Sequence, residues 1–182
     1  MDKERQEKAV ILDGSSIIRA LSRISYEILE RNKGSEDICI IAIMSGGLNI
    51  ASKIAAKINE LEGTAVKVGA LDITSCRDDE RHAPDCDKTV IDFDVTGKKI
   101  ILVDDVIFTG RSARAAIDAL MKRGRPQSIQ LAVLIDRGHR ELPIRPDYVG
   151  KNVPTSRDES VKVIFDGKDG KGENLAKYFP TV

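Results

Sequence analysis

The stretch that decides the fold is IILVDDVIFTGRS, residues 100–112. Its first four residues are apolar, and they lead into two adjacent carboxylates, Asp104 and Asp105, before a glycine turn of sequence TGRS. The apolar run predicts a buried strand over 99–104, and the pattern of residues 111–123 predicts a helix. A strand that passes through a glycine turn into a helix is typical of α/β folds.

The rest of the chain repeats this alternation of strands and helices. We expect a helix capped by Ser15 or Ser16 that runs to about Asn32. Its apolar residues recur at three and four and define one buried face, made of Ile17, Ile18, Leu21, Ile24, Ile28 and Leu29. The other predicted elements are strands at 38–44, 65–73, 128–136 and 161–165 and a helix at about 49–60.

The apolar character of these strands indicates how they are arranged. The run ICIIAIM (38–44) is almost entirely apolar, as expected for a parallel strand that is buried on both faces. We therefore predict an α/β fold with a mainly parallel sheet flanked by helices, in a single domain over 1–182. Residues 74–97 are polar and irregular, which predicts a flexible loop, and RGHRELPIRPDY (137–148) predicts another loop.

Composition limits the classes of function. The chain has 182 residues, with 29 basic and 29 acidic side chains and a formal net charge of zero. This balance argues against a globally basic nucleic-acid binder, so no DNA partner is expected, but it permits a local basic face. The cysteines, Cys39, Cys76 and Cys86, form no C-x-x-C pair, so we expect a reduced cytoplasmic setting. No signal peptide or membrane span is predicted.

The turn after the acidic pair has the chemistry of a phosphate site. In open α/β sheets, ligands gather at the carboxyl ends of the strands, and the free N–H groups that begin a helix suit a phosphate. Gly110 permits close approach of the backbone, and Thr109 and Ser112 add hydroxyl donors. Asp104 and Asp105 would repel phosphate, so they fit the hydroxyls of a sugar or a Mg²⁺ ion bound to it. The alternative is structural, with Asp104 capping the turn and Asp105 solvated.

The whole pattern resembles the 5-phosphoribosyl-1-pyrophosphate (PRPP) motif of type I phosphoribosyltransferases. Residues 128–156 are similar to one branch, the PyrR family, which combines a pyrimidine-operon attenuator with a uracil phosphoribosyltransferase. ILERNKG (28–34) and DITSCRDD (72–79) match the same branch. The resemblance implies a type I phosphoribosyltransferase fold, with a small hood over the base and a flexible loop.

The resemblance also implies roles for individual residues. Asp104 and Asp105 are expected to bind the ribose hydroxyls as the catalytic pair, and Arg137 and Val161 to lie in or near the hood. The residues expected to bind PRPP or nucleotide are Ser45, Gly46, Arg77, Val106, Ile107, Phe108, Thr109, Gly110, Arg111 and Ser112. The implied reaction converts uracil and PRPP to UMP and pyrophosphate, with Mg²⁺ carried by PRPP rather than held by the protein.

Two departures from the family pattern bear on activity. Purine-salvage relatives carry an acid immediately before T-G, where this chain has Phe108, which argues against a purine substrate. The pyrophosphate loop of the PyrR branch usually reads K-T-R-G, whereas this chain has Met44-Ser45-Gly46-Gly47. Two cationic side chains are thus missing, although small residues still allow backbone N–H groups to bind an anion. Turnover is expected, with weak activity as a consequence of this loop.

The family's second activity is binding of the leader of pyrimidine-operon mRNA, favoured by UMP and opposed by free PRPP. UTP is expected as a further nucleotide ligand. By resemblance the RNA-binding residues are Arg19, Ser22, Arg23, Tyr26, His139, Arg140, Arg145 and Lys151, on a homo-oligomer that is a dimer or a tetramer. The structural alternatives are that the polar face of the first helix is simply solvated, and that His139 and Arg140 form an ion pair within their loop. Three functions remain open: an enzyme with a regulatory RNA role, an RNA-binding regulator that has lost turnover, and a purine salvage transferase.

Overall fold

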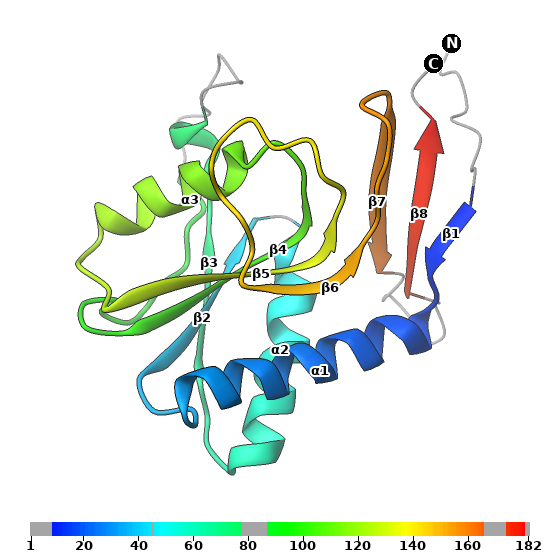
Figure 1. Cartoon of the computed structure of the whole chain (residues 1–182). Coiled ribbons are helices and arrows are strands. Elements are labelled where there is room, and N and C mark those ends of the chain that lie inside the picture. The colour runs from blue at the N-terminus through cyan, green and yellow to red at the C-terminus, as the bar shows by residue number, and fades with distance from the viewer. Residues whose placement is uncertain (1–8, 45, 78–86, 166–173, 181–182) are drawn as a thin grey trace.

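The computed structural model of the protein describes residues 9–44, 46–77, 87–165 and 174–180. Its centre is a five-stranded sheet of order β3-β2-β4-β5-β6, in which every neighbouring pair is parallel (Figure 1). The strands are β2 (Ile38–Ile43), β3 (Lys67–Leu71), β4 (Lys99–Ile107), β5 (Ser128–Asp136) and β6 (Tyr148–Asn152). The prediction of an α/β fold with a parallel sheet is confirmed.

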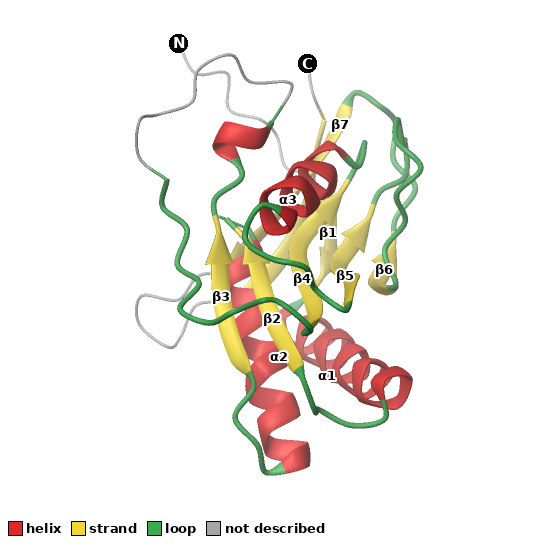
Figure 2. Ribbon diagram, turned by 90° about the vertical axis from the view of Figure 1, so that its left-hand side faces the viewer, coloured by secondary structure: helices red, strands yellow, loops and turns green. Residues whose placement is uncertain are grey.

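Helices cover both faces of this sheet, which explains the continuous apolar runs. The helices α1 (Gly14–Asn32) and α2 (Gly47–Glu62) lie on one face, and α3 (Arg111–Met121) lies on the other (Figure 2). Along β4, Ile101 and Val103 belong to the core under α1 and α2, while Ile100 and Leu102 belong to the core under α3. Successive side chains of a strand point to opposite faces, so both sets of residues must be apolar.

A second, smaller sheet stands beside the first (Figure 1). It is antiparallel, has the order β1-β8-β7, and consists of β1 (Ala9–Leu12), β7 (Glu159–Phe165) and β8 (Asn174–Pro180). Val161, Val163 and Phe165 of β7 are partly buried against the core under α1 and α2. This sheet is in the place of the expected hood. Of its strands, only β7 was predicted.

Several predicted details of the elements are wrong. The N-cap of α1 is Asp13, whose Oδ1 accepts a hydrogen bond from the Ser16 N–H at 2.7 Å, so neither Ser15 nor Ser16 caps the helix. Ile18 was assigned to the buried face but is 55% exposed. Strand β6 (Tyr148–Asn152) was not predicted, and its first residue, Tyr148, was assigned to the loop 137–148. No helix in the described ranges is long and apolar enough to cross a membrane.

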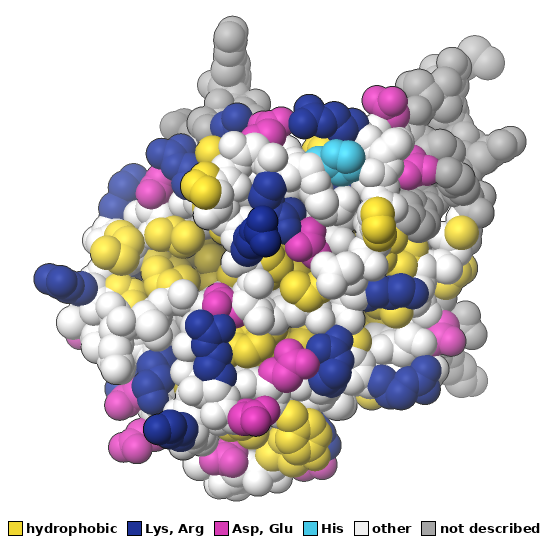
Figure 3. All heavy atoms as spheres, viewed as in Figure 1, with side chains coloured by type: hydrophobic (Ala, Val, Ile, Leu, Met, Phe, Trp, Pro, Cys, Tyr) yellow, Lys and Arg dark blue, Asp and Glu magenta, His cyan; other side chains and the backbone are white. Residues whose placement is uncertain are grey.

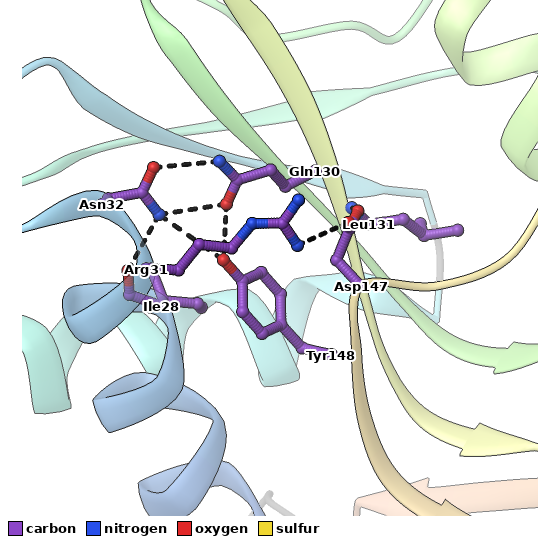
Figure 4. A network of polar contacts seen from close by, with 7 residues as sticks. All are labelled: Ile28, Arg31, Asn32, Gln130, Leu131, Asp147 and Tyr148. Atoms are coloured by element: carbon purple, nitrogen blue, oxygen red, sulfur yellow. Dashed lines mark hydrogen bonds and ion pairs between the residues drawn. The ribbon is translucent and has the colours of Figure 1, made fainter.

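A buried polar network joins the end of α1 to β5 and β6 (Figure 4). The Asn32 and Gln130 side-chain amides exchange hydrogen bonds of 3.0 and 2.9 Å, and the Tyr148 hydroxyl donates to Gln130 Oε1 at 2.5 Å. Just outside, Arg31 pairs with Asp147 at 2.6 Å, and Asp147 accepts the Leu131 N–H at 2.8 Å. Since β6 is an edge strand with few buried apolar residues, these contacts attach it to α1.

This network predicts the effect of removing its central amide. Gln130 is 8% exposed, so Gln130→Met should leave the Tyr148 hydroxyl and the Asn32 carbonyl without their main partner. Unsatisfied buried groups of this kind lower the free energy of unfolding by about 1–3 kcal/mol. The measurement is urea denaturation. The control is the same change at exposed Gln127, which should have almost no effect, and equal stability of both variants would contradict the prediction.

Candidate functional site

The strand order creates a crevice at one end of the large sheet. From β2 the chain crosses over α2 to β3 on one side, and from β4 it crosses over α3 to β5 on the other. The connections that leave the neighbouring strands β2 and β4 thus run in opposite directions. The loops after these two strands therefore part at the carboxyl ends of the strands, and a crevice forms between them. The first loop holds Met44 to Gly46, and the second holds Phe108 to Gly110. Ser45, one of the expected pyrophosphate-binding residues, lies outside the described residues.

Strand β4 extends past the end of its pairing with β2. The β2 register ends at Ala42 opposite Val103, whereas pairing with β5 continues to Ile107 opposite Asp136. Asp104 and Asp105 therefore both lie within β4, which continues to Ile107 and so extends past the predicted end of the strand at Asp104. Their Oδ1 atoms accept the next backbone N–H groups, of Asp105 at 2.9 Å and of Val106 at 2.7 Å. Each carboxylate thus accepts the N–H that follows it in the chain, in the part of β4 where pairing with β2 has ended.

Burial perturbs both carboxyl groups. It raises the pKa of Asp104 well above its ordinary value of 3.8, and the neighbouring charge of Asp105 raises that pKa further. Burial also raises the pKa of Asp105. Asp105 is partly buried and accepts the Val106 N–H, whereas the structural alternative placed it in solvent. Two carboxyl groups held together in this way favour a ligand with hydroxyl donors or positive charge.

Glycines bring the start of α2 against this pair. A Cβ atom at Gly46 would lie 2.5–2.6 Å from the carboxyl atoms of Asp105, and one at Gly47 would lie 2.2 Å from the Val103 carbonyl oxygen. Only residues without a side chain permit this approach. Gly47 matches the glycine of the family's K-T-R-G loop, whereas Gly46 departs from its arginine and is the residue that lies against Asp105. Restoring an arginine at Gly46 would force Asp105 to move.

A cavity of about 330 Å³ lies beside β4 on the face of the sheet that α3 covers. Its lining combines the predicted PRPP residues with apolar residues of β5 and α3: Arg77, Asp104, Val106, Ile107, Phe108, Thr109, Gly110, Arg111, Ser112, Ala113, Leu131 and Val133. The Arg77 guanidinium reaches this cavity and donates to Ser112 Oγ at 3.4 Å. The structure thus brings Arg77, Asp104 and the turn after β4 together, while Asp105 and Gly46 lie beside them.

The turn after β4 has the geometry of an anion site. Gly110 has φ +93°, a left-handed conformation that favours glycine, and it is the N-cap of α3. Gly110 offers no side-chain cap, and the Arg111 N–H donates to Thr109 Oγ1 at 3.4 Å. The start of α3 lines the cavity together with Thr109. Donors at a helix N-terminus, together with the helix dipole, bind phosphate.

The loop 137–145 wraps around this turn. The Arg140 guanidinium donates to the Phe108 carbonyl at 2.8 Å, and the Glu141 N–H donates to the Thr109 carbonyl at 2.9 Å. Glu141 also pairs with Arg111 at 3.0 Å. No local pattern indicated Glu141 as part of the site, because each of its contacts crosses about thirty residues of chain.

Arg137 connects the turn to the segment that leads into the small sheet. It is 7% exposed, and its guanidinium lies 3.9 Å from the centroid of the Phe108 ring. It donates to Thr155 Oγ1 and to the Ser156 carbonyl, each at 3.0 Å. Arg137 thus lies between the turn and the segment that leads into the small sheet, and neither it nor Val161 lines the cavity beside Asp104.

The residues expected to bind RNA fall on α1 and around β6. Arg23 donates to the Val149 and Gly150 carbonyls at 3.0 and 2.7 Å, and Lys151 donates to the Ile11 carbonyl at 3.1 Å, so the two regions lie side by side. On α1, Arg19 and Tyr26 are exposed and Ser22 is half-buried. Figure 3 shows basic and acidic side chains intermingled over the face in view, without a continuous basic patch.

His139, Arg140 and Arg145 line a second hollow of about 480 Å³ next to β6. Arg145 is exposed, whereas His139 contacts the Thr155 carbonyl. Arg140 is committed to Asp136 and to the Phe108 carbonyl, which belongs to the turn after β4. Because Arg140 supports this turn as well as lining the hollow, a change at Arg140 is expected to disturb both.

The model of the phosphoribosyl transferase domain matches residues 9–164, which include the sheet, the acid pair and the glycine turn, so the chain is a phosphoribosyltransferase by class. Proteins from Geobacter sp. (strain M21) and Acetivibrio thermocellus, each named Bifunctional protein PyrR, are 56% and 58% identical over 88% and 90% of this chain and 92% and 91% of theirs. The chain therefore belongs to the PyrR family of phosphoribosyltransferases.

Solved structures support the fold. The hypoxanthine phosphoribosyltransferase of Trypanosoma cruzi has a TM-score of 0.70 at 16% identity and covers 96% of this chain and 98% of its own. A hypoxanthine-guanine phosphoribosyltransferase from Bacillus anthracis has a TM-score of 0.68 at 21% identity and covers 97% and 99%. Identities this low establish a common architecture and carry no information about the base.

The raised pKa of Asp104 predicts how stability depends on pH. The unfolded carboxyl ionises near 3.8 and the folded one only at higher pH, so the free energy of unfolding falls as pH rises through that window. Asp104→Asn removes this penalty and should raise the melting temperature at pH 7 by a few degrees, since about 1 kcal/mol shifts it by roughly 2–4 °C in a domain of this size.

Thermal unfolding followed by circular dichroism between pH 3.5 and 8 measures this effect. The gain should vanish near pH 3.5, where the native carboxyl is protonated in the wild type. Asp118→Asn, at an exposed position on α3 that pairs with Arg114, is the control and should show no such gain. An Asp104→Asn variant less stable than wild type at pH 7 would contradict the prediction.

Proposed function

We propose that this protein transfers the phosphoribosyl group of PRPP to uracil, and that it binds the leader of pyrimidine-operon mRNA in a manner that depends on UMP. The observation that carries the first part is the cavity in which Arg77, Asp104 and the turn 108–112 meet. The branch to which the chain belongs supports the second part, since relatives that cover most of it are named bifunctional.

The geometry suits binding of a ribose 5-phosphate unit. The N–H groups at the start of α3 and the hydroxyls of Thr109 and Ser112 would hold the 5′-phosphate, and Asp104 and Asp105 would accept hydrogen bonds from the ribose hydroxyls. Fixing the sugar in this way orients C1 toward the base as its bond to pyrophosphate breaks. Mg²⁺ carried by PRPP suits the two carboxylates and would neutralise the departing pyrophosphate.

The loop after β2 would receive the pyrophosphate. Backbone donors at the start of α2 replace the cationic side chains that the family usually has there, and Gly46 lets them lie next to Asp105. Backbone donors alone bind a highly charged anion less strongly than donors joined by lysine and arginine. Slow turnover is therefore part of the proposal, and a regulator that retains the nucleotide site without turnover is the second candidate.

The base would lie between the turn and the hood. Purine enzymes of the superfamily carry an acid at the position of Phe108, and Phe108 offers no carboxylate to a purine ring nitrogen. The Arg137 guanidinium stacks on the Phe108 ring. Val161 of β7 is partly buried against the core under α1 and α2. These contacts favour the smaller pyrimidine.

We therefore expect uracil to be the one base turned over detectably among uracil, hypoxanthine, guanine and orotate. The measurement is a steady-state assay with PRPP and Mg²⁺. The matched control is the double variant Asp104→Asn, Asp105→Asn, which should lose roughly 10²-fold or more in kcat/KM because the sugar is no longer positioned. Faster turnover of hypoxanthine or guanine would remove the assignment.

The RNA-binding part of the proposal concerns the face formed by α1 and β6. Phosphate contacts dominate the affinity of proteins for nucleic acid, so exposed cations are required. Arg19, Arg145 and Lys151 are exposed on this face, and exposed Tyr26 could stack on an unpaired base. We propose that a dimer or tetramer of the chain presents this face, in a cytoplasmic setting.

Neutral variants test this face. Arg19→Gln, Arg145→Gln and Lys151→Gln should each weaken binding to a pyrimidine-leader hairpin and flatten the dependence of log K on log salt by something approaching one unit. Arg114→Gln, on α3 across the sheet, is the control and should change neither. UMP should tighten RNA binding, and RNA should tighten UMP binding by the same factor.

Anisotropy titrations at several salt concentrations, with and without UMP, measure these effects. Binding that is absent at low salt, or that all three variants leave untouched, would leave the chain with the transferase function alone.

A further inference from the structure

Asp72, directly after β3, joins two segments of chain that lie far apart in sequence. Its half-buried carboxylate accepts hydrogen bonds from the Thr74 N–H at 3.0 Å and the Thr74 hydroxyl at 2.6 Å. The other carboxylate oxygen accepts the Lys88 N–H at 3.2 Å. One side chain thus binds the chain as it leaves β3 and as it returns.

The backbone around Asp72 closes the same junction. Its N–H donates to Thr89 Oγ1 at 3.0 Å, and Ala70 and Val90 exchange two backbone hydrogen bonds of 2.8 Å. The hydrogen bonds from Thr74 lower the pKa of Asp72, so the carboxylate is ionised and accepts strongly. We call this junction of residues 70–74 and 88–90 the Asp72 clasp.

The clasp leads directly to the cavity. Thr74, which Asp72 holds, begins the short 3₁₀ helix η1 (Thr74–Cys76), and Arg77 follows at once. The Arg77 guanidinium then donates to Ser112 Oγ and lines the cavity together with Asp104. A single 3₁₀ turn has little freedom, so the position of Thr74 determines where Arg77 begins.

We propose that Asp72 is a positioning residue for phosphoribosyl transfer, and that the clasp holds Arg77 at the phosphate-binding turn. The Arg77 guanidinium reaches Ser112 of this turn. PRPP would bring its negative charge to the same turn. Without the clasp, η1 would move, and PRPP binding would have to order Arg77 first. The inference rests on the proposed function, because it needs PRPP to bind at this turn.

A double-mutant cycle tests whether Asp72 acts through Arg77. Asp72→Ala should raise the KM for PRPP about tenfold, which corresponds to about 1.4 kcal/mol, and should change kcat less than about threefold. In a chain that already carries Arg77→Ala, Asp72→Ala should have almost no further effect. Thr74→Val, which removes only the 2.6 Å contact, should give a smaller effect in the same direction and serves if Asp72→Ala fails to fold.

The control is Asp94→Ala. Asp94 accepts the Thr96 N–H at 2.8 Å in the same connection between β3 and β4, but it does not hold η1. It should leave the KM for PRPP unchanged. Calorimetric titration of each variant with PRPP and Mg²⁺ gives the affinity separately from turnover.

The outcomes separate the inference from the proposed function. A wild-type chain that does not bind PRPP overturns both. A wild type that binds PRPP, together with an Asp72→Ala variant that binds equally well, overturns the inference alone. Effects of Asp72→Ala and Arg77→Ala that simply add also overturn it, because Asp72 would then act independently of Arg77.

Discussion

The contact on which the site depends is the approach of Gly47 to the backbone of β4. A side chain at Gly47 would begin 2.2 Å from the Val103 carbonyl oxygen, so α2 can begin there only because glycine has no Cβ. This contact sets the start of α2 at the level where pairing between β2 and β4 ends. Asp105 therefore lies against the start of α2, where Gly46 approaches its carboxyl group.

The same geometry leaves the fold with two adjacent acids that are both partly buried. Adjacent carboxyl groups in a strand oppose each other's ionisation, and burial adds to the penalty. The structure limits this cost by giving each Oδ1 a backbone N–H and by bringing Arg77 near Asp104. Ionisation of Asp104 and Asp105 is unfavourable in the protein alone. A sugar that donates several hydroxyl hydrogen bonds would stabilise the two carboxylates on binding.

Much of the fold could be predicted from the sequence because burial leaves a local pattern. Strand β5 was predicted with its observed bounds, since its apolar run is bounded by polar residues. Strand β6 was missed because it lies at the edge, where only Tyr148 is buried, and a polar network rather than an apolar run attaches it. The exposure of Ile18 also escaped prediction, since periodicity cannot tell how wide the buried face is.

The site was predictable only in part, for a similar reason. The turn 108–112 carries its chemistry in consecutive residues, and the structure places them around one cavity. The support from Arg140 and Glu141 comes from a loop about thirty residues further along. Such contacts follow from how the chain returns to the sheet, and no local motif encodes them.

The attachment of the loop 137–145 to the turn 108–112 has a consequence for how this protein can evolve. Arg140 and Glu141 hold the turn, and Arg145 of the same loop reaches the exposed hollow beside β6. Under the proposed function, a substitution in this loop would affect the nucleotide site and the RNA-binding face together. A lineage that lost turnover would still need the shape of the phosphate-binding turn to keep that face, so the turn would persist after catalysis is lost.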